Sequence, residues 1–142
     1  MIPRGAAIFG IIGIVPFLAG ASLARWPIVN PTLTALAKDD WLLLHYGTVI
    51  LCFLSGVLWG FATRTEGREA GFAYTFAVLP AIFAATALLP LHPYRVEAMI
   101  LGYTATLLID FWFWNEGIAP MWWMRFRAIL TVVVLASLTS AL

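Results

Sequence analysis

Long apolar stretches alternate with short polar ones along the chain, and charged residues mark most of the boundaries. A helix rises ~1.5 Å per residue and therefore needs ~20 residues to cross a hydrocarbon core that is ~30 Å thick. The apolar stretches have about this length, and no strand-like alternation of polar and apolar positions competes with them. The pattern predicts an all-α, polytopic chain with five membrane-crossing helices, at residues 6–23, 41–62, 71–89, 96–114 and 120–142.

These helices are expected to form one domain over residues 1–142. The longest connection, between Arg25 and Asp40, is expected to hold a short interfacial helix within residues 31–38, capped by Thr32 or Thr34. Pro120 would suit the first turn of the fifth helix, where a missing N–H costs nothing.

Composition supports a membrane protein and excludes two other classes. The chain is 63% apolar and 11% charged, against about 45–50% and about 25% in soluble domains. Its 7 Trp, 10 Phe and 4 Tyr argue against a disordered chain, which would be poor in aromatic residues. The net charge of +1 gives no clustered basic surface for nucleic acid.

The positive charges suggest an orientation. Five spans place the two termini on opposite sides, with one side holding Arg4, Arg64, Arg68, Arg125 and Arg127, and the other holding Arg25, Lys38 and Arg95. Because cytoplasmic loops carry the excess of Lys and Arg, the N-terminus is predicted inside and the C-terminus outside. Tryptophans would then form an inner belt that includes Trp122 and Trp123, and an outer belt of Trp26 and Trp41.

Four residues are expected to shape helix packing. Gly56 and Gly60 lie one turn apart on one helix face, a spacing that lets a second helix approach closely. We expect this partner helix to lie within the same chain. Pro16 and Pro80 each remove a backbone hydrogen bond in mid-span and are expected to kink their helices.

Asp110 is the one carboxylate inside a predicted span. A charge in lipid is costly, so Asp110 should face protein or water and find a partner. The candidates on the same side are Arg125, Arg127 and Arg64. A buried ion pair that fixes the fourth helix against the fifth is the favoured interpretation. A role for Asp110 in a small oligomeric transporter or channel, with cavities at the kinked prolines, is the alternative.

Two histidines are candidates for a cofactor or metal. His45 begins the second span and His92 lies in the third loop, both on the predicted outer side. One interpretation is that they bind a divalent metal together with nearby carboxylates, and another is that they clamp a haem in an electron-transfer protein. Their spacing matches no metal motif, so we expect no cofactor. The chain also has no recognised catalytic motif, and we expect no enzymatic activity.

Several segments taken together resemble a known family. These are Gly56, Trp59 and Gly60, followed by the series Asp110, Pro120, Trp122 and Arg127. Their order is similar to that of the transmembrane-protein-69-like family of small bacterial and mitochondrial membrane proteins of unknown function. Leu58 departs from the histidine or arginine that often stands there. The resemblance implies five helices in an inner membrane, and it matches Asp110 and Arg127 together, as an ion pair or a shared inner-face site.

The sequence therefore favours a structural or accessory protein of the bacterial inner membrane. Such a chain would contact the lipid bilayer and pack its helices against other subunits, such as those of a respiratory or photosynthetic complex, or against a second copy of itself.

Overall fold

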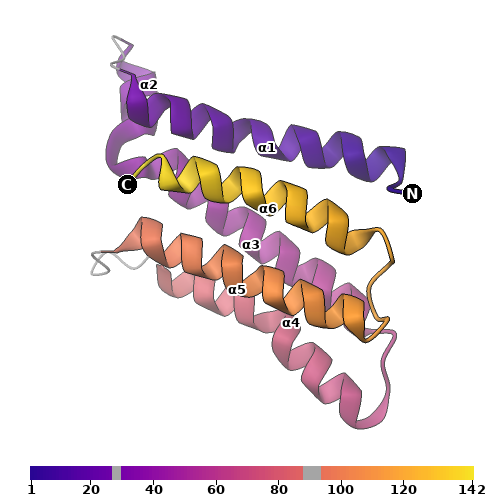
Figure 1. Cartoon of the computed structure of the whole chain (residues 1–142). Coiled ribbons are helices and arrows are strands. Elements are labelled where there is room, and N and C mark those ends of the chain that lie inside the picture. The colour runs from indigo at the N-terminus through magenta and orange to yellow at the C-terminus, as the bar shows by residue number, and fades with distance from the viewer. Residues whose placement is uncertain (27–29, 88–93) are drawn as a thin grey trace.

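The computed structural model describes residues 1–26, 30–87 and 94–142, which are helical almost throughout (Figure 1). The described elements are α1 (Arg4–Arg25), α2 (Pro31–Ala37), the 3-10 turn η1 (Lys38–Asp40), α3 (Trp41–Ala62), α4 (Gly67–Ala87), α5 (Arg95–Asn115) and α6 (Trp123–Thr139). The described residues contain no strand, so the all-α prediction is confirmed for them. The bounds of α3 are those predicted from the apolar pattern.

The fifth predicted span begins later than expected. Residues 120–122 are not helical, because the chain leaves α5 through Gly117, whose φ of 72° is a left-handed conformation that glycine tolerates best. The amides of Ile118 and Ala119 then donate to the carbonyl of Phe113 at 2.9 and 3.0 Å and close the end of α5. Pro120 accordingly precedes α6 instead of lying in its first turn, and the expectation for Pro120 was wrong.

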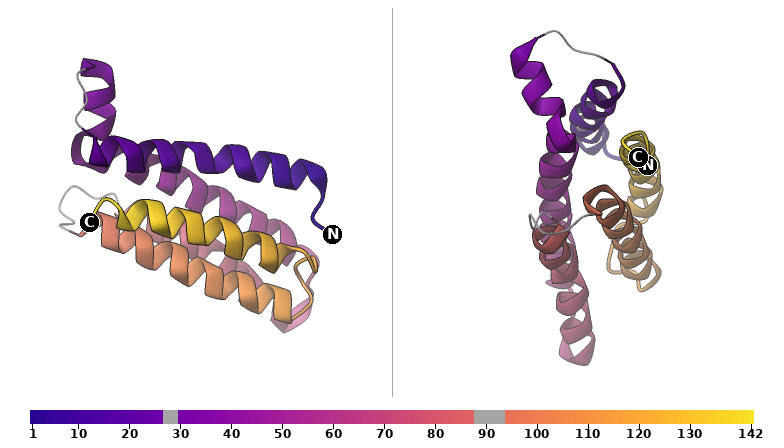
Figure 2. Two further views of the ribbon diagram at one scale, coloured as in Figure 1. Left: turned by 45° about the horizontal axis from the view of Figure 1, so that its top comes forward. Right: turned by 90° about the vertical axis from the view of Figure 1, so that its left-hand side faces the viewer.

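Five long helices run along one another, and the two termini lie at opposite ends of the bundle (Figures 1 and 2). α3 packs against α1, α4 and α5, whereas α6 packs against α1 and α5. The short helix α2 connects α1 to α3 at one end (Figure 1). It lies in the stretch where a short helix was expected, but its cap is Asn30, whose side chain accepts from the amides of Thr32 and Leu33, and not a threonine.

Four of the described helices are long and apolar enough to cross a membrane, namely α1, α3, α4 and α5. α6 has 17 residues, which correspond to ~25 Å of helix. α1 is the most exposed of the four, since 11% of its apolar window is buried in the bundle. Large apolar side chains therefore face outward along α1, as expected of a helix in contact with lipid, and they include Ile8, Phe9, Ile11, Ile12, Val15 and Leu18.

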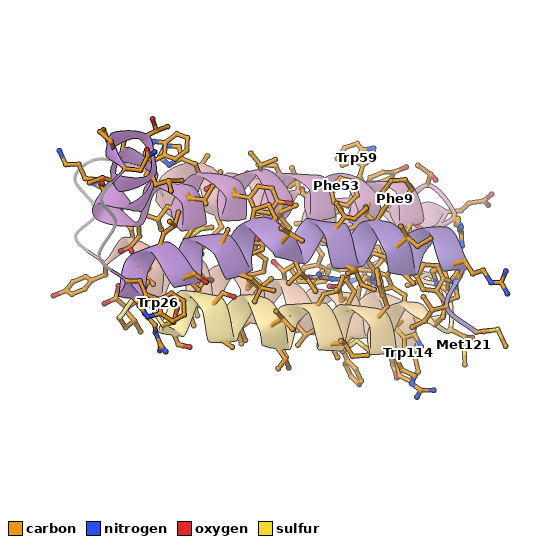
Figure 3. The ribbon with its side chains drawn as sticks, turned by 90° about the horizontal axis from the view of Figure 1, so that it is seen from above. Phe9, Trp26, Phe53, Trp59, Trp114 and Met121 are labelled. Carbon is orange, nitrogen blue, oxygen red and sulfur yellow. The ribbon has the colours of Figure 1, made fainter. Side chains whose placement is uncertain are left out.

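Aromatic side chains lie toward both ends of the bundle. Figure 3 places Trp26 at one end and Trp114, beside Met121, at the other. Trp26 is 68% exposed, which suits an indole at a membrane–water interface. Trp123 differs, because it is buried in the core although the sequence placed it in the inner belt.

Glycines allow three pairs of helices to approach closely. A side chain at Gly20 of α1 would meet Leu43 of α3 at 2.7 Å, and one at Gly102 of α5 would meet the ring of Phe83 at 2.8 Å. Gly10 of α1 likewise lies against Phe126 of α6. Because such distances leave no space for a Cβ atom, these glycines position α1 and α5 on their neighbours.

Gly56 and Gly60 do not pack inside the chain. Both are exposed on the outer side of α3, and a Cβ atom at either would meet nothing within 4 Å. The expectation of an intramolecular contact at this pair was wrong, because the inward face of α3 is formed by a different set of residues, among them Leu51, Ser55 and Leu58.

The two mid-helix prolines lie in different surroundings. Pro80 is buried in α4, and Pro16 is partly buried in α1. Ser55 of α3 donates to the carbonyl of Ala77 at 2.5 Å, one turn before Pro80. Since a proline removes a backbone donor from the helix, this side chain supplies a donor near the interrupted turn and joins α3 to α4 there.

Candidate functional site

The charged site of the bundle is an ion pair between α5 and α6. Arg127 Nε donates to Asp110 Oδ2 at 2.8 Å, and Trp123 Nε1 donates to Asp110 Oδ1 at 2.6 Å. Asp110 is fully buried, Arg127 is 3% exposed and Trp123 is 7% exposed. Both carboxylate oxygens therefore accept a hydrogen bond from α6.

Helix periodicity explains how the three side chains meet. Trp123 and Arg127 are four residues apart and share one face of α6. Asp110 lies on the buried face of α5, between Thr106 and Phe113, and this face packs toward α6. One carboxylate on α5 thus meets two donors on successive turns of α6.

The structure selects one of the three candidate cations. Arg127 pairs with Asp110, whereas Arg125 points away from the bundle and is exposed. Arg64 is exposed too, and its guanidinium lies 5.8 Å from the centre of the Phe61 ring. Because a buried charge that loses its partner is strongly unfavourable, the pair ties α5 to α6.

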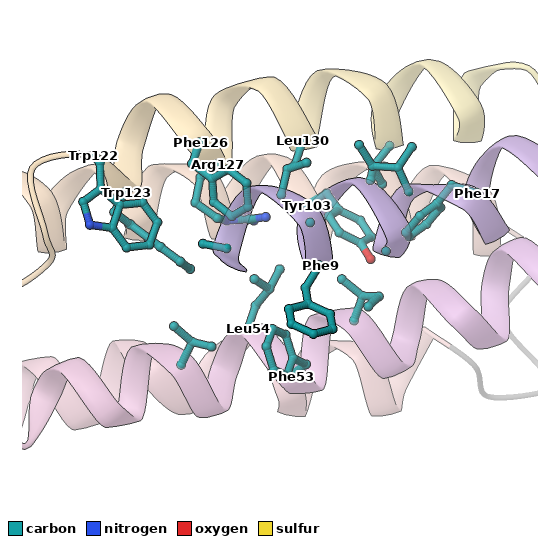
Figure 4. A pocket seen from close by; sticks show the side chains of 17 residues that line it. Phe9, Phe17, Phe53, Leu54, Tyr103, Trp122, Trp123, Phe126, Arg127 and Leu130 are labelled. Atoms are coloured by element: carbon teal, nitrogen blue, oxygen red, sulfur yellow. The ribbon is translucent and has the colours of Figure 1, made fainter. Parts of the chain in front are cut away.

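A cavity lies beside this ion pair. It has a volume of about 260 Å³ and is lined by residues of α1, α3 and α6 and by Tyr103 of α5. Figure 4 shows Arg127 on its wall, among Trp123, Phe126 and Tyr103. The lining is otherwise almost entirely apolar.

Arg127 has a buried donor group without a partner. Its Nη2 is buried and has no hydrogen-bond partner, which is also true of Thr131 Oγ1 among the described side chains. Arg127 borders the cavity and Thr131 does not. Since buried polar groups are nearly always hydrogen-bonded in proteins, the spare N–H of Arg127 calls for an acceptor.

Two tyrosines bind backbone carbonyls of neighbouring helices. Tyr103 donates to the carbonyl of Gly47 at 2.8 Å, and Tyr46 donates to that of Gly13 at 3.1 Å. Neither was a candidate site residue from the sequence. These bonds join α5 to α3 and α3 to α1, and the bond of Tyr103 holds a residue that lines the cavity.

Of the two histidine candidates, His45 lies within the described residues. His45 is exposed, and its ring stacks on that of Trp41 with 4.3 Å between the ring centres. Its Nδ1 lies 2.8 Å from the backbone carbonyl oxygen of Trp41. His92 lies outside the described residues. Within residues 1–26, 30–87 and 94–142 there is no group of three or more His, Cys, Asp or Glu side chains that would hold a metal.

Sequence reasoning missed the role of Trp123. It was assigned to an interfacial belt because five of the seven tryptophans cluster near one end of the spans. The available signal was its spacing of four from Arg127, which places an indole N–H and a guanidinium on one helix face.

Residues 2–142 match the model of a family described as protein of unknown function, DUF3429. The chain belongs to this family. The matched residues include all the helices of the bundle and the buried ion pair. The family description assigns no activity.

One relative of this DUF3429 chain is transmembrane protein 69 of Xenopus tropicalis. The two are 29% identical over 142 residues, which cover 99% of this chain and 54% of the relative. The chain thus spans about half the length of the curated relative that it matches. The expected resemblance to the transmembrane-protein-69-like family is confirmed. No solved structure matches the chain.

Proposed function

We propose that this chain is a structural or accessory membrane protein that packs its helices against another membrane-spanning helix and performs no catalysis. The partner helix would belong to a larger membrane assembly or to a second copy of the chain. The observation that carries the proposal is the outward position of Gly56 and Gly60 on α3.

The use of glycine elsewhere in the bundle supports this role. At Gly10, Gly20 and Gly102 a side chain of a neighbouring helix occupies the space that a Cβ atom would need. Gly56 and Gly60 form the same kind of shallow surface, with the spacing that brings membrane helices together, but none of the described helices covers it. The exposed ring of Trp59 lies on the same helix and would enlarge a contact there.

The ion pair supports a structural role for the charged residues. Both oxygens of Asp110 accept hydrogen bonds from Trp123 and Arg127, and the pair is buried between two helices. This arrangement favours a helix clamp over the alternative of an ion-transporting carboxylate. The exposed position of His45 likewise gives the electron-transfer alternative no support.

We infer that all five long helices cross the bacterial inner membrane, with the N-terminus inside and the C-terminus outside. The 17 residues of α6 lie at the short end of the range of ~17–25 residues for membrane spans. The distribution of Lys and Arg favours this orientation.

The proposal is tested by the size of the solubilised protein. In mild detergent, the wild type is expected to run above the mass of a monomer, as a complex or an oligomer. Replacing Gly56 and Gly60 by Leu should release a folded monomer, because the larger side chains hold the partner helix away. Replacing Gly5 and Gly71 by Leu is the matched control, since these glycines are equally open. A wild type that runs as a bare monomer and yields no cross-linked partner would overturn the proposal.

A further inference from the structure

The cavity between α1, α3 and α6 opens toward the outer surface of the bundle. Phe9 of α1 and Phe53 of α3 both border it, and they are 74% and 63% exposed. Figures 3 and 4 show these two rings close to each other, at the gap between their helices. In a membrane this gap faces lipid, so a molecule dissolved in the bilayer has a lateral route into the cavity.

The walls of the cavity are suited to a flat ring. Phe17, Tyr103, Trp122, Trp123 and Phe126 line it together with the two rings at its mouth. Aromatic rings pack favourably face to edge or in offset stacks on another planar ring. The volume of about 260 Å³ is just below the ~300–1,000 Å³ of pockets for drug-sized ligands. It therefore holds a single-ring head group and leaves a long tail outside.

The polar wall of the cavity offers a donor. The indole N–H of Trp123 is used by Asp110, and the hydroxyl of Tyr103 is used by the carbonyl of Gly47. Arg127 Nη2 is buried without a partner on a side chain that borders the cavity. A ligand that fits this wall carries a hydrogen-bond acceptor.

The charge of the site decides which acceptor is favoured. Asp110 already balances the guanidinium of Arg127 at 2.8 Å. An anionic ligand would bring an unbalanced negative charge into an apolar cavity, which is costly. A neutral carbonyl oxygen accepts the N–H without this cost.

We propose that this cavity binds a neutral, membrane-dissolved molecule with a flat, carbonyl-bearing ring, of the quinone class. The ring lies among the aromatic side chains, and one carbonyl accepts from Arg127 Nη2. The apolar tail leaves between Phe9 and Phe53 into the lipid.

The test measures binding of a decyl-substituted benzoquinone to the full chain in detergent, through quenching of tryptophan fluorescence. Gly13 lines the cavity, and a Cβ atom there meets nothing nearer than the Tyr46 hydroxyl at 3.9 Å, so Gly13→Leu fills the space without a clash of its Cβ. Arg127→Lys keeps a cation beside Asp110 but removes Nη2. Gly5→Leu, on the same helix and outside the cavity, is the matched control.

The wild type and Gly5→Leu are expected to show saturable quenching with the same Kd. Gly13→Leu and Arg127→Lys should each raise the Kd by about tenfold or more, as expected for loss of space or of a hydrogen bond to a charged group. Heat unfolding shows which variants fold, and if Arg127→Lys does not, Gly13→Leu decides. Quenching that never saturates, an unchanged Kd in folded Gly13→Leu or in folded Arg127→Lys, or displacement of the probe by decanoate as readily as by excess quinone would overturn the proposal.

Discussion

Asp110 illustrates how one residue can organise a membrane protein. A carboxylate inside an apolar span is a prominent sequence signal, and its burial beside an arginine follows from the cost of an unpaired charge. Two donors of α6 bind its two oxygens, Trp123 at 2.6 Å and Arg127 at 2.8 Å. The group is thereby held by protein on both oxygens, which is the arrangement of a clamp between helices.

A clamp predicts a specific pattern of stabilities. Asp110→Leu leaves Arg127 buried without a counter-ion, and Arg127→Met leaves the Asp110 carboxylate buried without one. Each replacement should therefore lower the free energy of unfolding by about 3–5 kcal/mol. The double replacement removes both charges and should recover most of this loss. Heat unfolding in one detergent, followed by circular dichroism, measures all three variants. A double variant as unstable as the sum of the two single ones would contradict a clamp.

Among the elements, the long helices were well predicted by the apolar pattern. A helix in lipid must hydrogen-bond its own backbone polar groups and present an apolar surface, and the pattern records this surface. α3 has the predicted bounds, whereas the last helix starts at Trp123 because Gly117 reverses the chain and Ile118 and Ala119 cap α5. The pattern did not tell which face of a helix looks inward, since nearly every face is apolar. For this reason the sequence could not show that Gly56 and Gly60 face away from the other helices of the chain.

Two alanine replacements should separate inner from outer glycines. Gly102→Ala puts a methyl group 2.8 Å from the ring of Phe83 and should destabilise the bundle by about 1–3 kcal/mol, the usual cost of overpacking. Gly56→Ala meets nothing within 4 Å and should be neutral or stabilise by up to about 1 kcal/mol, because alanine is the better helix former. Heat unfolding of the isolated monomer compares the two. Equal destabilisation by both would show that the outer face of α3 is not free.

At the scale of the whole molecule, five long helices place the termini at opposite ends of the bundle (Figure 1). The cavity belongs to this scale too. It is formed by residues of four helices, among them Phe9, Phe53, Tyr103 and Arg127, whose meeting depends on the tertiary arrangement and not on any local spacing. The ion pair was therefore predictable from the sequence, and the space beside it was not.

An odd number of spans with the N-terminus inside predicts a C-terminus outside. Alkaline phosphatase fused after Leu142 should be active in a bacterial host, because this enzyme folds on the outer side of the inner membrane, and a green fluorescent protein fused there should stay dark. The same pair of fusions placed after Thr65, between α3 and α4, should give the opposite result. A fluorescent C-terminal fusion would mean that α6 does not cross the membrane or that the orientation is reversed.

If α3 packs against a helix of another chain, its outer face should be close enough for cross-linking. A photoreactive amino acid in place of Gly56, irradiated in native membranes, detects this contact, with the same amino acid in place of the exposed Ile129 of α6 as the control. We predict a discrete cross-linked protein product from position 56 and none from position 129. Products that are absent at position 56, or equally abundant at both positions, would contradict this contact.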